Sequence, residues 1–154
     1  MVKNVFSYSL LLFFFFSCTS SKPRDFKPGE YRCEFCQMNI VDMRFKAELI
    51  TQKGKIHHFD SIECMMGWWA NHREKTASRW VSDFYSPETW IPLEKAFLLK
   101  SKTLPSPMRA FLSAYASEQE LKRALQEYGG VEWNTRQLES YIEGPWQEEV
   151  KKGE

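Results

Sequence analysis

The sequence predicts a small α+β domain made of two strand-strand-helix units. Three observations support this prediction: a run with strand periodicity in the first half, an amphipathic helical run directly after it, and the same order of elements again in the second half. The chain has 154 residues, 43% of them hydrophobic and 27% charged, which is the profile of one ordinary globular domain. We therefore expect a single domain containing both element types.

The first unit is expected before the middle of the chain. Apolar and charged residues alternate over residues 43–51, which predicts a half-buried strand. The turn "KGK" then leads into "IHHFD", a second short strand that completes a hairpin. Asp60 followed by Glu63 is typical of a helix start, and apolar residues at helical spacing predict a helix over residues 61–74.

The second unit has a less regular pattern. Strands are predicted for "RWVSDFY" (79–85), "AFLLKS" (96–101) and "RAFLSAYA" (109–116). Ser117 with Glu120 forms a capping box before "EQELKRALQEY", which ends at Gly129. Beyond Asn134 we expect one more short helix. The folded domain is thus placed at residues 31–142, with a charged tail over 143–154.

The N-terminal residues are typical of an export signal. Lys3 precedes an unbroken apolar run that is too short to cross a bilayer, so we assign residues 1–17 to a signal peptide. The run ends at a serine followed by Cys18, an order that resembles the lipobox of bacterial lipoproteins. We expect Cys18 to carry a lipid anchor and residues 18–30 to form a flexible tether. The expected location is the bacterial cell envelope, with the domain membrane-anchored and facing the periplasm.

The charge balance argues against a nucleic-acid partner. The formal net charge is +1 and falls to zero once the signal, with its single charged residue Lys3, is removed. A protein that binds phosphate backbones needs a dense field of Lys and Arg, and here both signs are mixed along the chain. The sequence also has no nucleophile elbow and no glycine-rich phosphate loop, so we expect no enzyme.

The stretch "YRCEFCQMNI" holds the residues most suited to chemistry. Cys33 and Cys36 are spaced to reach one ion or to bond to each other, and an exported location permits a disulfide. If the backbone is extended, Cys36 and Met38 point to one face and can converge on one ion. Soft sulfur ligands of this kind select Cu(I).

Further donors lie later in the chain. Cys64 falls on the first predicted helix, where an inert buried thiol is as plausible as a ligand. His57 and His58 must point to opposite sides of a strand, so at most one can face a given site. Met108 lies alone in a loop, and its residue type by itself assigns it no role.

The stretch "CEFCQMNI", followed by "RFKAELITQKGKIHHFDSIECM" and the run from "RWVSDFY" to "LQEYGG", resembles the NosL family of nitrous oxide reductase accessory lipoproteins. The resemblance implies two strand-strand-helix units, a membrane anchor outside the cytoplasm, and Cu(I) binding for delivery to a copper enzyme such as nitrous oxide reductase. It places the family's Cys-x-Met signature on Cys36 and Met38 and implicates Met108 as a further ligand. Three departures leave the ligand set open: Gln37 and Arg109 stand where glycine is common, and Cys33 is an extra thiol.

Two alternatives remain at this point. "CEFC" followed by "FDSIEC" also resembles the treble-clef modules of the TRASH and YHS type, which implies zinc or a heavy metal on Cys33, Cys36 and Cys64 with a histidine or water completing the site. In the other alternative, Cys33 and Cys36 form a disulfide in a scaffold protein of the envelope.

Overall fold

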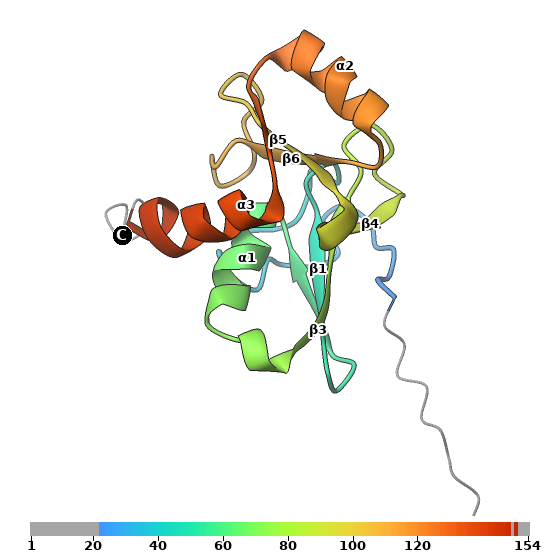
Figure 1. Cartoon of the computed structure of the whole chain (residues 1–154). Helices are drawn as coiled ribbons and strands as arrows, with labels where there is room; N and C mark the ends of the chain where they lie inside the picture. The colour runs from blue at the N-terminus through green and yellow to red at the C-terminus, as the bar shows by residue number, and fades with distance from the viewer. Residues whose placement is uncertain (1–21, 149, 151–154) are drawn as a thin grey trace, which may run out of the picture.

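A computed structural model describes residues 22–148 and residue 150 of the chain. This part forms two antiparallel sheets, each with a helix packed against it (Figure 1). The predicted α+β class is therefore confirmed. The signal peptide expected over residues 1–17 and the expected lipid anchor Cys18 lie outside the described residues. Within those residues, no helix has the length and apolar character needed to cross a membrane.

The first sheet has four strands in the order β2-β1-β3-β4. These are β1 (Ala47–Thr51), β2 (Ile56–Phe59), β3 (Thr76–Ser82) and β4 (Trp90–Pro92). Helix α1 (Ile62–Ala70) packs against β1 and β2 and ends before the predicted residue 74, which instead lies in a separate 3₁₀ turn, η1 (Arg73–Lys75). The sequence thus places this unit correctly but extends its helix by one turn too many.

The second sheet has three strands in the order β6-β5-β7. These are β5 (Phe97–Lys100), β6 (Leu112–Tyr115) and β7 (Val131–Trp133), and a 3₁₀ turn, η2 (Leu93–Lys95), precedes them. Helix α2 (Glu118–Tyr128) covers β5 and β6. The predicted capping box of Ser117 and Glu120 is confirmed, and Gly129 closes the helix at a φ of 62°, where glycine avoids strain.

The C-terminal segment packs beside the first helix. Helix α3 (Thr135–Tyr141) continues into a wider π-helical turn, η3 (Ile142–Trp146), which contacts α1. Trp146 is buried, and its ring lies 5.5 Å from that of Phe35 between their centroids. The segment that the sequence predicts as a tail from residue 143 therefore contains a core residue, Trp146.

The outer face of the first sheet is covered as well as the inner one. The strand predicted over residues 43–51 is present as β1, but the prediction that it is half-buried is wrong, because Lys46 and Glu48 are buried together with its apolar residues. Residues of the predicted tether provide the cover: the Lys46 Nζ atom lies 5.2 Å from the centre of the Phe26 ring. The Glu48 carboxylate accepts a hydrogen bond from the Arg24 backbone N–H. The chain is thus folded onto the sheet from about residue 24.

Candidate metal centre

Cys33 and Cys36 lie on a tight turn. The Cys33 N–H donates to the Met38 carbonyl at 2.8 Å, and the Gln37 N–H donates back to the Cys33 carbonyl at 3.0 Å. A bond from the Glu34 N–H to the His58 carbonyl, at 3.0 Å, fixes this turn to strand β2. The turn therefore presents its side chains toward the end of the first hairpin.

The extended backbone expected between Cys36 and Met38 is wrong. Gln37 has a φ of 64°, in the left-handed region, so the two side chains are not consecutive members of one strand face. Met38 is instead 46% exposed and lines a cavity of about 350 Å³ together with Asp60 and the loop Pro105–Pro107. The thioether thus lies at the surface, beside a cavity that Asp60 also lines.

The second part of the centre comes from the start of α1. Ser61 is the N-cap residue, and its hydroxyl accepts from the Cys64 N–H at 3.2 Å. The prediction that Asp60 caps this helix is therefore wrong, because the next residue makes the capping bond. The Asp60 side chain is left free to turn toward the cysteines, and it is only 3% exposed.

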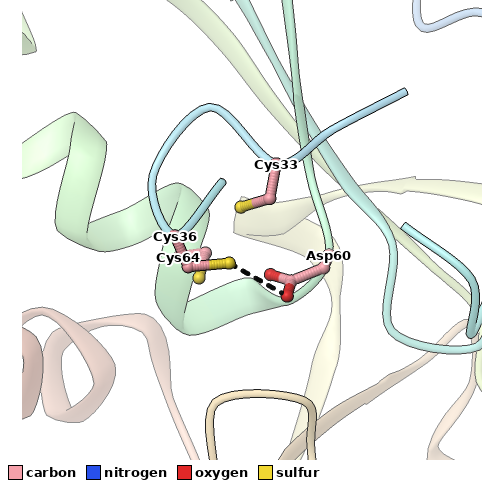
Figure 2. Close-up of side chains that lie close together, drawn as sticks. All are labelled: Cys33, Cys36, Asp60 and Cys64. Atoms are coloured by element: carbon pink, nitrogen blue, oxygen red, sulfur yellow. Dashed lines mark hydrogen bonds between the residues drawn. The ribbon is translucent and has the colours of Figure 1, made fainter. Parts of the chain in front are cut away.

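Three thiols and one carboxylate converge at this point. Single donor atoms of Cys33, Cys36, Cys64 and Asp60 all lie within 4.8 Å of one another (Figure 2). The Cys36 Sγ donates to Asp60 Oδ2 at 3.3 Å, and none of the three cysteines is in a disulfide. Cys33 and Cys64 are buried, whereas Cys36 is partly exposed. Such a set of donors can hold a metal ion.

The three thiols are hydrogen-bonded to one another, and their pKa values shift in opposite directions. Hydrogen bonds from Cys36, and then from Cys64, lower the pKa of Cys33 far below its usual value. Hydrogen bonding to Cys33 correspondingly raises the pKa of Cys36 and of Cys64. Burial, followed by the charge of Cys33, raises the pKa of Asp60 to about 6. A metal ion that binds to these thiols must displace the protons that they hold.

The loop that carries Met108 is tied to α1 beside the cysteines. Glu63, fully buried next to Cys64, accepts a hydrogen bond from the Ser106 hydroxyl at 2.5 Å and a longer one from the Ala110 N–H. Burial raises the pKa of Glu63 to about 7. Met108 itself is half-buried against the core, in the loop that borders the same cavity as Met38.

The two histidines are engaged elsewhere. The Nδ1 atom of His57 lies 3.3 Å from a Glu34 carboxylate oxygen, and that of His58 lies 2.9 Å from a Glu48 oxygen. The His58 ring also stacks on Tyr31, with centroids 3.9 Å apart. Within the described part of the chain, the group that could hold a metal contains neither histidine.

Sequence reasoning did not identify Asp60 as a donor. An aspartate just before a helix is usually a cap, and here Ser61 offers a second capping side chain one residue later. The signal that could have revealed it is this redundancy: when two capping residues adjoin, one of them is available for another role.

Comparison with known proteins places the chain in a family. A model of the NosL family matches residues 25–141, which span both cysteine segments and the Met108 loop. The chain belongs to the NosL family. A solved structure, the crystal structure of the copper chaperone NosL from Shewanella denitrificans, resembles the chain with a TM-score of 0.66 at 15% sequence identity. The match covers 76% of this chain and 96% of that one, so the two share a fold. A search of curated proteins finds no match.

Two of the three departures from the expected NosL pattern lie at positions with a positive φ angle. Gln37 and Arg109, which stand where the resemblance leads us to expect glycine, have φ angles of 64° and 59°. Glycine adopts this region without strain, whereas a residue with a Cβ atom does not. Both loops thus hold a residue with a Cβ atom in the left-handed backbone region.

Proposed function

We propose that this NosL family member is an extracytoplasmic Cu(I) carrier. The observation that supports the proposal most is the position of Cys36, which belongs to the three-thiol cluster and lies two residues before the exposed Met38 in a Cys-x-Met motif. Thiolate and thioether sulfurs are the ligands that select Cu(I) among biological metals. The copper chaperone from Shewanella denitrificans, with the same fold, supports the same role.

In this proposal Cys36 and Met38 bind the ion at the cavity mouth. Met108, whose loop borders the cavity, is proposed as the third ligand, with Cys33 or Cys64 contributing from within. A partner thiolate or histidine reaches the exposed thioether first and replaces the ligands one at a time. The protein is then a carrier that passes copper by ligand exchange and catalyses no reaction.

The wider proposal covers the anchor, the location and the recipient, and the family resemblance supports it. We propose that Cys18 carries a lipid, that the domain faces the periplasm of a bacterial envelope, and that the recipient is a copper enzyme, nitrous oxide reductase being the family's usual client. Cu(I) transfer from loaded protein to the apo recipient, followed by recipient activity, tests that partner.

A Cu(I) competition titration tests the function itself. The reduced full chain, titrated against a chromophoric Cu(I) chelator, is expected to take up one Cu(I). Met38→Leu removes a proposed ligand and is expected to weaken binding, whereas Met43→Leu, a thioether outside the cavity lining, is not. If the wild-type chain takes up no Cu(I), or if both variants bind as tightly as wild type, the proposal fails.

The disulfide-scaffold alternative makes a separate prediction. If Cys33 and Cys36 are bonded in the exported protein, neither reacts with an alkylating reagent before reduction. The carrier proposal requires both thiols to be free, as they are in this structure. Partly exposed Cys36 is then labelled first and the buried Cys33 only upon unfolding, which mass spectrometry of the labelled peptides measures.

A further inference from the structure

A second cavity lies in the first unit, separate from the cysteine cluster. Its volume is about 420 Å³, and it opens between the turn that joins β1 to β2 and the residues around the end of α1 and η1. Both of these segments lie at the lower end of the view in Figure 1. Among the described residues, it shares no lining residue with the cysteine cluster or with the cavity beside Met38. A ligand in this cavity would therefore not occupy the proposed copper site.

Three aromatic rings pack together along one wall of this cavity. The His72 ring stacks on Trp68 with centroids 3.8 Å apart, and the His57 ring lies 4.4 Å from Trp68. The His72 Nδ1 atom is also 2.8 Å from the Trp68 carbonyl oxygen. On the opposite side, the Gln52 N–H donates to the Lys75 carbonyl at 2.8 Å and ties the hairpin turn to η1. The cavity is thus formed before a ligand enters, as small-molecule sites usually are.

The rim of the cavity is positively charged. Lys53, Lys55 and Lys75 line it and are exposed. In the part of the chain that the structure describes, no carboxylate lies within ion-pair distance of Lys53 or Lys55. Lys75 has Glu74 at 4.0 Å, but both side chains are mostly exposed, so this pair is weak. Positive charge gathered around a hollow attracts anions.

His57 is the buried polar residue of the wall. It is 6% exposed, and its Nδ1 atom lies 3.3 Å from a Glu34 carboxylate oxygen. Burial lowers the pKa of His57, and the charge of Lys55 acts in the same direction. The ring is therefore neutral at pH 7, and it offers a ligand hydrogen bonding without adding to the positive charge of the rim.

We propose that this cavity binds a small amphipathic anion, with a phosphate or carboxylate group between the lysines and an apolar part against the aromatic wall. Lysine is a common point-charge partner of phosphate, and Trp68 gives an apolar group a large contact area. A soluble organic anion and an anionic phospholipid both carry this chemistry. The proposal does not rest on the proposed copper function.

Phenyl phosphate is the probe, because it joins one phosphate group to one apolar ring. It is titrated into the ¹⁵N-labelled, reduced, metal-free full chain in non-ionic detergent, followed by NMR. Backbone amide signals of residues 51–55 and 72–75 are expected to shift until saturated, while those of the cysteine turn stay in place. Inorganic phosphate and benzyl alcohol, which each lack one half of the probe, should bind more weakly. No saturable shift at residues 51–55 and 72–75 overturns the proposal.

Paired lysine variants test the rim. Lys53→Gln combined with Lys55→Gln is expected to lower the affinity for phenyl phosphate at least about tenfold. Lys102→Gln combined with Lys122→Gln is the matched control, because it removes the same charge from exposed lysines outside the cavity. The control should bind as wild type does. Equal affinities of the two double variants would show that the attraction is not specific to this rim and would overturn the proposal.

Phosphatidylglycerol added to the detergent micelles distinguishes the two sources of the anion. Displacement of phenyl phosphate by this lipid assigns the site to a phospholipid headgroup, and retention of the probe assigns it to a soluble anion. Cu(I) titration of the same samples separates this proposal from the copper function. Copper uptake without anion binding overturns only the anion site, and anion binding without copper uptake overturns only the copper function.

Discussion

Cys36 lies between an internal and an external group of donors. On the inner side its thiol contacts Asp60, and on the outer side the chain continues to the exposed Met38. Being partly exposed, it is also the thiol that a partner protein can reach most directly. The proposed copper site therefore depends on this residue.

Arg109 provides a test of the strained loop next to Met108. Its φ of 59° costs a residue with a Cβ atom about 1 to 2 kcal/mol. Glycine removes this strain, but it also raises the entropy of the unfolded chain, which offsets part of the gain. Arg109→Gly is expected to raise the free energy of unfolding by roughly 0.5 to 1 kcal/mol in urea denaturation. Arg109→Ala, which keeps the Cβ atom, is the control; equal effects of the two would contradict the role of backbone strain.

The residues of the site differ in how far the sequence predicts them. Cys33 and Cys36 stand out because their spacing alone limits how far apart their sulfurs can be. Cys64 is brought to them only by the packing of the hairpin against α1, which the sequence suggests but does not determine. Asp60 could not be predicted as a donor, because its orientation depends on which of two adjacent residues makes the capping bond.

Helix α1 connects the cysteines to the methionine loop. It carries Cys64 at its third position. The preceding residue, Glu63, accepts hydrogen bonds from Ser106 and Ala110 of the loop. Because the Glu63 contact is buried, the loop cannot move away from the helix without exposing a carboxylate and breaking this bond. The relative position of Met108 and the thiols is therefore set by the helix.

Glu63 should make the stability of the metal-free protein depend on pH. Its pKa is about 7 in the folded state against 4.5 for the unperturbed group, so the folded state binds more protons between these values. The free energy of unfolding must then fall as pH rises from 4.5 to 7, by about 3 kcal/mol from this group. Asp60, whose pKa is also raised, adds a contribution of the same sign.

Glu63→Gln isolates the contribution of Glu63. The variant keeps an oxygen that can accept from Ser106 but cannot ionise, so it should lose this share of the pH dependence and be relatively more stable at pH 7 than at pH 4.5. Denaturant unfolding of both proteins at several pH values measures the difference. Parallel curves for wild type and variant would show that Glu63 does not titrate in this range.

Gly67 marks the close approach of α1 to the C-terminal segment. A Cβ atom at this position would lie 2.7 Å from the Trp146 ring and 3.0 Å from Phe35, which is part of the cysteine turn. Gly67→Ala is therefore expected to destabilise the protein by about 1 to 3 kcal/mol.

Gly144→Ala is the matched control for this substitution, because nothing lies within 4 Å of its Cβ position. It should leave the free energy of unfolding unchanged or raise it slightly. Thermal or urea unfolding of the two variants gives the comparison, and a Gly67→Ala protein as stable as wild type would contradict the packing of Trp146 on the cysteine turn.

The molecule as a whole is more enclosed than its sequence suggests. Strand periodicity predicts one solvent-exposed face for β1. The segment from Arg24 to Tyr31, however, covers Lys46 and Glu48 on that face. Local alternation cannot reveal a cover supplied by residues twenty positions away. The helices and most of the longer strands, by contrast, follow from local patterns and capping residues. The short strands β4 and β7 are not predicted, and β3, which the sequence assigns to the second unit, joins the first sheet.

The NosL family and its fold set the position of the cluster within the molecule. The cluster lies where the cysteine turn, the end of β2 and the start of α1 meet. In the second unit, residues 105–107 of the Met108 loop line the cavity beside Met38 and Asp60. The two strand-strand-helix units thus each supply part of the proposed copper site. A ligand set divided in this way requires both units to be folded before copper is held.

The Cu(I) affinity of Cys36→Ser, compared with wild type by competition titration, tests the central claim most directly. Both chains would be reduced, metal-free and checked for equal folding by circular dichroism. We expect the variant to lose at least about a hundredfold in affinity, because Cys36 is the thiolate common to every proposed copper ligand set. Wild-type affinity in the Cys36→Ser chain would contradict the account.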